Sequence, residues 1–295
     1  MSDTELHLVA PRQALGSQLR ELWRFRELWW QLVRRDLTAK YKRSVLGIAW
    51  SLLNPVFLLV IYTVAFTILG QAFERFAIWL LAGLLPWTLL SSALSTGTTS
   101  ITGNAYLLGK VRFPRAILPL AAVGAAFVNF LMQAGVFAAV LILMRHDVDW
   151  AYIWLVIPAL ATLLLLVSAL VLLLSNLNVF ARDTQHFLDF AILGWFWLTP
   201  IVYAYDLVVR LLAEHDAPTW LGLLNPATDV VIAIQRGVYG KAALVSDSGV
   251  TALLPDESPW WYLRNLAVVF VIAAVAFVAA LRAFDRTEGN FAEMV

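Results

Sequence analysis

The chain has 295 residues, of which 61% are apolar and only 14% are charged, and its mean hydropathy is +0.77. Soluble domains are typically about 45–50% apolar and about 25% charged, so this composition excludes an ordinary soluble protein and equally excludes a disordered one. The net charge of +1 gives no indication of a nucleic-acid partner. From the apolar composition we expect an integral membrane protein. Cysteine is absent and the four histidines are far apart in the sequence, so we expect no metal site.

The segment before the first long apolar run divides into two parts. Residues 1–17 are expected to form a flexible tail, and residues 18–43 an amphipathic helix. Four residues of the helix recur at three- and four-residue steps and therefore share one apolar face: Trp30, Val33, Leu37 and Tyr41. Most of the basic residues lie off this face, so we expect the helix to lie in the membrane interface, beside anionic head groups.

Six charge-free runs follow in the sequence. A helix that crosses the roughly 30 Å hydrocarbon core needs about 20 apolar residues. The first four runs are long enough, whereas the fifth must borrow residues 186–189 and the sixth must borrow residues 260–264. We therefore predict an all-α membrane domain over residues 44–284 with six spanning helices, and a cytoplasmic tail over residues 285–295. The runs are Ser44–Phe73, Phe76–Gly109, Ala116–Met144, Trp150–Ala181, Phe190–Tyr205 and Asn265–Leu281.

Lysine and arginine are distributed unevenly among the segments that flank these spans. If the N-terminus is inside, the inner segments carry fifteen basic residues and the outer segments five. The positive-inside rule therefore predicts that both termini are cytoplasmic. No charged residue falls at mid-membrane depth, which disfavours an ion-coupled carrier.

The two inner links between spans have unusual sequences. The first, over residues 104–115, carries three cations and no acid, and its Pro114 would stop a helix. The second covers residues 176–186. Each link is either a simple positive-inside anchor or a short helix that contacts a cytoplasmic partner.

The first link superficially suggests a phosphate-binding loop. Five residues separate Gly103 from Gly109, however, where the motif requires four, and Val111 stands where a serine or threonine must reach Mg²⁺. We therefore expect no ATP hydrolysis by this motif.

The last outer segment, residues 206–259, carries seven acidic residues against three basic ones. Two short amphipathic pieces, 207–213 and 229–239, are too short to cross the membrane. We expect them to form short re-entrant helices, which the membrane tolerates only where protein or water covers their backbone.

Aromatic residues are frequent on the first and fifth spans. Some of them would face lipid, but an aromatic stripe on one face would let sugar rings slide along it without a fixed hydrogen-bond pattern. The residues that we expect to line such a path are Trp50, Tyr62, Phe66, Trp195, Trp197 and Tyr203.

At residues 34–55, the sequence RRDLTAKYKRSVLGIAWSLLNP resembles the opening of permease subunits of ABC-type exporters for O-antigen, capsule and wall teichoic acid. Later motifs of that family follow in the same order, and the resemblance extends over roughly residues 20–295. These motifs are Asn104…Phe113-Pro-Arg115…Leu118-Pro119, Asn178-Val-Phe-Ala-Arg-Asp183, Thr199-Pro-Ile-Val-Tyr203, Asn225-Pro226 and Phe291-Ala-Glu293.

The resemblance implies a multi-pass permease of the bacterial cytoplasmic membrane that forms a homodimer and binds two copies of a separate ABC ATPase. The ATPase would hold the ATP and Mg²⁺, so this chain would be a transport subunit without a cofactor or an enzymatic activity of its own. Its substrate would be a polyprenyl-pyrophosphate-linked polysaccharide or a teichoic acid, and its other contacts would be membrane lipids rather than nucleic acid.

The resemblance also implies roles for particular residues. The substrate head group would enter beside the basic residues Arg34, Arg35, Lys40, Lys42 and Arg43, whose charge suits a pyrophosphate. Coupling to the ATPase would fall to Asn104, Lys110, Arg112, Phe113, Pro114, Arg115, Arg182 and Asp183. The region 207–240 would form a re-entrant gate, and the loop 241–259 has no counterpart in this scheme.

Two alternatives remain open. The first is a membrane enzyme that acts on lipid-linked sugars, which would require paired carboxylates such as Asp183 with Asp189 or Asp206 with Asp216. The second is a related ABC permease that exports a small lipid or a drug.

Overall fold

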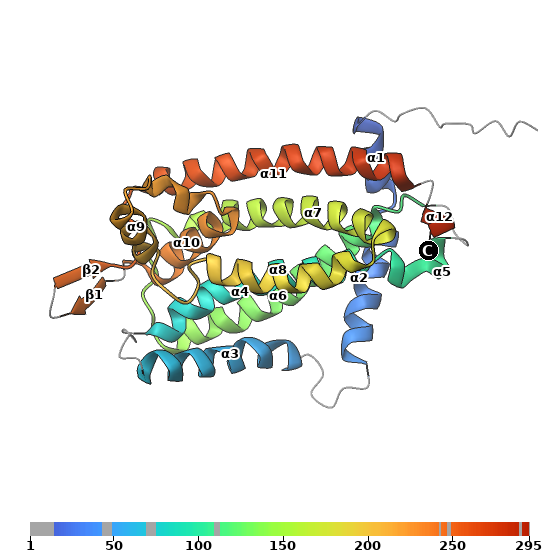
Figure 1. Cartoon of the computed structure of the whole chain (residues 1–295). Coiled ribbons are helices and arrows are strands. Elements are labelled where there is room, and N and C mark those ends of the chain that lie inside the picture. Colours follow the sequence, from blue (N-terminus) through green and yellow to red (C-terminus); the bar gives the residue numbers. More distant parts are fainter. Residues whose placement is uncertain are drawn as a thin grey trace, which may run out of the picture.

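The computed structural model describes residues 15–42, 49–68, 75–108, 113–241, 243–246, 249–288 and 291–294. Long helices lie side by side in a bundle, with a helical pair set across one end and a β-hairpin projecting at the other (Figure 1). We name the two ends by their helices. The α2 end carries α1, α2, α5 and α12, and the α10 end carries α9, α10 and the hairpin.

Six helices of 16 to 29 residues run along the bundle in the described part of the chain: α3 (Ala49–Ile68), α4 (Phe76–Thr98), α6 (Ile117–Leu143), α7 (Val156–Phe180), α8 (Asp183–Leu198) and α11 (Pro259–Thr287). By length and apolar composition, four described stretches can cross a membrane: Phe76–Thr98, Ile117–Leu143, Ile153–Phe180 and Pro259–Thr287. The third combines α7 with the short 3-10 helix η2 (Ile153–Leu155). The expected helical membrane protein is thus confirmed at this coarse level.

Three helices, α4, α8 and α11, have ends that differ from those of the charge-free runs. α4 ends at Thr98, and the chain then passes through η1 (Thr102–Asn104) and α5 (Ala105–Leu108). The sequence before and after this point is rich in serine, threonine and glycine, whose side chains or backbone freedom compete with a continued helix. An apolar or neutral run is therefore a poorer guide to a helix end than to a helix centre.

α8 occupies residues 183–198 rather than 190–205. Its end immediately precedes Thr199-Pro200, and a residue before proline is disfavoured in the helical conformation. α11 is longer than the run 265–281, since it begins with Pro259 in its first turn and continues through Arg282 and Arg286.

The chain between α8 and α11 forms the α10 end. It contains α9 (Tyr205–Glu214), η3 (Thr219–Leu223), α10 (Pro226–Tyr239) and an antiparallel pair, β1 (Ala243–Ser246) and β2 (Gly249–Ala252). The strand pair is an exception to the all-α expectation. Its sequence, ALVSDSGVTA, places turn-forming residues between two short segments with valine and threonine.

The helices at the centre of the bundle are α4 and α7. In α4, 72% of the most apolar stretch is buried, against 28% in both α6 and α11. Glycine allows the central pair to approach closely, because a Cβ at Gly97 of α4 would lie 2.3 Å from Val171 Cγ1 of α7. The outer faces of α6 and α11 are consequently left for lipid or for another protein.

Two helices occupy the predicted amphipathic region, namely α1 (Leu15–Arg24) and α2 (Arg26–Tyr41). α2 packs against α6, where Trp29 Nε1 donates a hydrogen bond to the carbonyl of Leu120 at 3.0 Å. Val33 of the expected apolar face is fully buried, whereas Trp30 is 49% exposed. A mainly apolar cavity of about 620 Å³ lies between α1, α2 and the start of α6. Residues 1–14 of the predicted tail lie outside the described residues.

Candidate functional site

The basic residues predicted to meet the substrate head group lie along α2 and just after it. Arg34, Lys40 and Lys42 are exposed. Arg35 is engaged, since it forms an ion pair with Asp36 at 2.8 Å and donates a hydrogen bond to the Tyr106 hydroxyl at 3.2 Å. This second contact ties α2 to α5 of the first link. Arg43 lies outside the described residues.

Three of the predicted aromatic residues belong to one cluster that joins α3, α4 and α8. Tyr62 stacks on Phe196 with ring centres 6.0 Å apart, and Phe196 contacts Trp197 edge-on at 5.5 Å. Trp87 of α4 packs edge-on against both Trp195 and Phe196, at 6.1 and 5.5 Å. Trp87 and Phe196, which connect the others and are buried, were not among the residues predicted to line the path.

The remaining aromatic predictions have different outcomes. Tyr203 follows α8 and donates a hydrogen bond from its hydroxyl to the carbonyl of Trp197 at 2.8 Å. The side chains of Trp50 and Phe66 lie outside the described part of the structure. An uninterrupted aromatic stripe along the predicted path therefore stays a prediction.

Asn225 connects the end of α8 to the start of α10. Its Oδ1 accepts hydrogen bonds from Trp195 Nε1 at 2.7 Å and from the Ala227 backbone amide at 3.1 Å. Its Nδ2 donates to Thr199 Oγ1 at 2.9 Å. Asparagine at the cap position followed by proline in the first turn is a typical helix start, so the Asn225-Pro226 motif has a structural reason.

Those of the predicted coupling residues that the structure describes gather at the α2 end. Asn104 donates to the carbonyl of Ser100 at 2.7 Å, and Phe113 and Pro114 lie just before α6. Arg115 donates to the carbonyl of Glu288, and its guanidinium lies 5.9 Å from the Phe291 ring centre. Lys110 and Arg112 lie outside the described residues.

Arg182 and Asp183 are exposed at the turn between α7 and α8. Asn178, one turn earlier, donates from Nδ2 at 3.4 Å to Thr102 Oγ1 of η1, which leads into the first link. The structure thus brings the first link and the α7–α8 turn together. A third segment, which includes the motif Phe291-Ala-Glu293, packs beside them. That segment comprises Glu288 and α12 (Phe291–Met294). Burial raises the pKa of the Glu288 carboxyl above its usual range.

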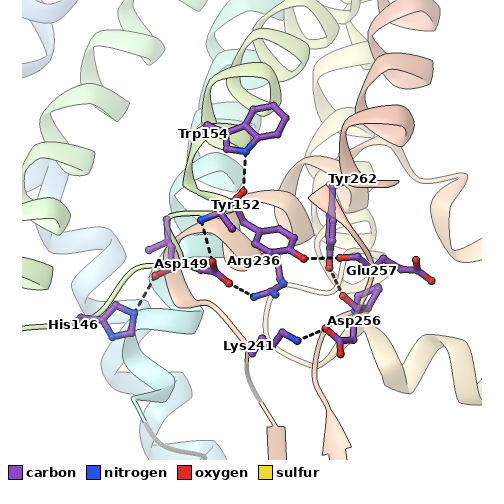
Figure 2. A network of polar contacts seen from close by, with 12 residues as sticks. His146, Asp149, Tyr152, Trp154, Arg236, Lys241, Asp256, Glu257 and Tyr262 are labelled. Carbon is purple, nitrogen blue, oxygen red and sulfur yellow. Dashed lines mark hydrogen bonds and ion pairs between the residues drawn. The ribbon is translucent and has the colours of Figure 1, made fainter. Parts of the chain in front are cut away.

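A polar network occupies the α10 end (Figure 2). Arg236 of α10 is 1% exposed, and its Nη1 forms an ion pair with Asp149 Oδ2 at 3.0 Å. Its guanidinium also lies 3.8 Å from the ring centre of Tyr152. The sequence presented Arg236 only as one basic residue of an outer segment, because its partners lie more than 80 positions away.

Further contacts fix the surroundings of this pair. His146 bonds to the carbonyl of Val238 at 3.0 Å, and the Tyr152 hydroxyl donates to the carbonyl of Glu257 at 2.8 Å. Lys241 forms an ion pair with Asp256 at 2.8 Å, which lowers the pKa of that carboxyl. These contacts connect the α6–α7 link, the end of α10 and both sides of the hairpin.

Carboxylates and imidazoles are scattered over the described residues. Among them, no three such side chains lie close enough to hold a metal ion. Asp206, one of the carboxylates considered for an enzyme, forms an ion pair with Arg210 on the same helix.

The family model for ABC-2 type transporters matches residues 27–238, which is most of the chain. The chain belongs to this family. The family expected from the ordered motifs is therefore confirmed. Membership in the ABC-2 family implies a membrane subunit that associates with an ABC ATPase.

The chain is also similar over nearly its whole length to proteins named O-antigen export system permease protein RfbA. The one from Myxococcus xanthus is 29% identical over 280 residues, which cover 94% of this chain and 98% of that protein. Two from Klebsiella pneumoniae are 29% and 28% identical over 268 and 266 residues, in each case 90% of this chain and 93% of the relative.

Proposed function

We propose that this chain is the transmembrane subunit of an ATP-driven exporter that moves an O-antigen-like polysaccharide across the bacterial cytoplasmic membrane. The observation that carries the proposal is the extent of the similarity. Relatives named as O-antigen export permeases match over at least 90% of this chain and at least 93% of their own length. A match of this extent covers nearly the whole chain rather than one shared segment.

The cargo is a glycan carried on polyprenyl pyrophosphate, with teichoic acid as the alternative polymer. The exposed cations Arg34, Lys40 and Lys42 in the α2 region support this choice, since lysine and arginine make strong charge-assisted bonds to phosphate oxygens. The helix that carries them lies across the bundle axis (Figure 1), as expected of a helix in the membrane interface.

All six bundle helices cross the membrane, and both termini are cytoplasmic. An even number of crossings returns the chain to the side where it began, and α1 and α12 lie at the same end of the bundle (Figure 1). The excess of basic residues in the predicted inner segments supports a cytoplasmic position for that end.

Two copies of the chain assemble with two ATPase subunits. The ATPases dock at the α2 end, against the first link and the α7–α8 turn, where Arg182 and Asp183 are exposed. α9, η3 and α10 close the opposite end as the outer gate. The large exposed apolar faces of α6 and α11 support a contact between copies as well as contact with lipid.

The proposal is tested by co-expressing the tagged chain with its ABC ATPase and purifying both in mild detergent. We expect a stable complex that hydrolyses ATP, and no hydrolysis by the chain alone. Cells that lack the chain should accumulate lipid-linked polysaccharide on the cytoplasmic side. Failure to capture an ATPase, or normal surface polysaccharide in such cells, would contradict the proposal.

A further inference from the structure

The aromatic ring of Phe291 is fully buried although it belongs to a helix of only four residues at the α2 end. It packs edge-on against Phe284 of α11, with ring centres 5.2 Å apart, and against Phe180 of α7 at 6.2 Å. The guanidinium of Arg115 lies 5.9 Å from the same ring. One side chain thus contacts three segments that are far apart in the sequence.

Arg115 is held by the C-terminal segment in two ways. Besides its position over the Phe291 ring, it donates from Nη1 to the carbonyl of Glu288. Arg115 is the last residue of the first link before α6, so these contacts fix the end of the link. A long cationic side chain that makes two such contacts loses most of its freedom to reorient.

The neighbouring helix ends are connected by polar contacts that do not involve Phe291. Thr287 Oγ1 donates to Asn176 Oδ1 at 2.8 Å, which ties the end of α11 to the end of α7. Asn178 then bonds to Thr102 of η1, which ties α7 to the start of the first link. The first link, the α7–α8 turn and the C-terminal segment therefore form one packed unit.

We propose that Phe291 is a positioning residue for ATPase coupling, which holds the first link and the α7–α8 turn at a fixed separation so that both respond together to the docked ATPase. This inference rests on the proposed function. Packed interiors switch between discrete arrangements rather than deforming gradually. When the Phe291 ring fills the space between the two docking segments, a displacement of one segment therefore moves the other, whereas a cavity in its place would let each segment move alone.

The test uses the complete complex in proteoliposomes and measures polysaccharide transported per ATP hydrolysed. Phe291→Ala should lower this ratio by about fivefold or more, the lower range for coupling between sites, while the ATPase still binds and hydrolyses ATP. Phe291→Leu, which keeps most of the apolar volume, should restore much of the ratio. Met294→Ala is the matched control, because Met294 lies on the same short helix and is 53% exposed.

A second measurement reports the geometry directly. The chain has no cysteine, so spin labels can be placed at Gly103→Cys and His186→Cys without a background. A side chain at Gly103 meets nothing within 4 Å, and His186 is exposed. Phe291→Ala should broaden the distribution of distances between the labels, and Met294→Ala should not.

An unchanged transport ratio or an unchanged distance distribution in Phe291→Ala would overturn the inference. If that variant does not accumulate in the membrane, Phe180→Ala, which removes another ring of the same contact at a side chain that is 45% exposed, is measured in both assays, and a distribution and ratio identical to wild type would overturn the inference equally. A wild-type chain that neither captures the ATPase nor transports polysaccharide would instead refute the proposed function itself.

Discussion

α9 and α10 are neighbours at the same end of the bundle, yet they are held in very different ways. In α10, twelve of the fourteen residues are buried, whereas in α9 only Tyr205 is buried. Both helices contain an arginine in an ion pair. The pair in α9 joins Arg210 to Asp206 within the helix, and these side chains are 54% and 31% exposed. The pair in α10 joins Arg236, whose side chain is only 1% exposed, to Asp149 in the α6–α7 link.

This difference divides the predicted gate region 207–240 into two parts. α10 packs among α4, α7 and α11 and is anchored at both ends, by Asn225 and by Arg236. α9 and η3 lie outside it with few buried groups. Segments with few buried contacts open at low free-energy cost, so α9 with η3 is the part that we expect to move, and α10 is part of the fixed wall.

The largest expected contrast comes from the two ion pairs. Arg236→Ala should destabilise the protein by about 3 kcal/mol or more, because it leaves Asp149 without its partner and removes the stacking on Tyr152. Arg210→Ala, the matched control in α9, should cost about 0–1 kcal/mol, as exposed pairs do. Thermal unfolding in detergent measures both variants, and equal losses would refute the division between the two helices.

Glycine substitutions should give a smaller contrast of the same sign. A Cβ at Gly237 of α10 would lie 3.0 Å from the Tyr152 carbonyl oxygen and 3.1 Å from Ile153 Cα, which are backbone atoms that cannot move aside. Gly237→Ala should therefore cost about 1–3 kcal/mol. At Gly222 of η3, the neighbours are the side-chain atoms Tyr205 Oη at 3.0 Å and Val208 Cγ1 at 3.2 Å, which can yield. Gly222→Ala should be nearly neutral in the same unfolding assay, and the reverse order would contradict the assignment.

The cap of α10 should contribute less again. Asn225→Ala removes the helix cap together with the hydrogen bonds to Trp195 and Thr199, and should cost about 1–2 kcal/mol. Asn225→Asp keeps the oxygen that caps the helix and accepts from Trp195, so it should recover most of this loss. Indole fluorescence of Trp195 in a background without the other tryptophans near it would report the broken contact, and an unchanged spectrum in Asn225→Ala would argue against it.

The smallest effect should be the pH dependence of the Lys241–Asp256 pair at the base of the hairpin. The pKa of Asp256 is lowered in the folded protein, so its contribution to stability is complete above the unfolded value of about 3.9 and is lost as the pH falls through the folded value. Both side chains are largely exposed, so the loss should be slight. Asp256→Asn should abolish this acid-dependent part of the unfolding curve, so the variant should be slightly less stable than wild type above pH 5 and equal to it at pH values below the folded pKa.

Long apolar runs predict helix centres well in this chain. The run 116–144 corresponds to α6 almost residue for residue, because it is apolar except for Asn129 and Gln133 and its ends are marked by charge. The run 76–109 extends eleven residues beyond the end of α4, since threonine, serine and glycine are uncharged but do not sustain a helix.

The parts that the sequence did not reveal are contacts between distant segments. Arg236 resembles any other basic residue until Asp149 is placed beside it, and Phe291 resembles a terminal apolar residue until Phe180 and Phe284 surround it. No periodicity encodes such pairs. The ordered motifs nevertheless included Asn178, Asn225 and Phe291, each of which has a specific contact in the structure.

We propose that this membrane subunit moves a lipid-linked polysaccharide with energy supplied by a separate ATPase. The most direct measurement places the chain and its ATPase in proteoliposomes and follows the appearance of polyprenyl-linked polysaccharide on the opposite leaflet. We expect transfer that requires ATP and both subunits, with no ATP hydrolysis by the chain alone. Transfer by the chain without the ATPase, or ATP hydrolysis by the isolated chain, would contradict the claim.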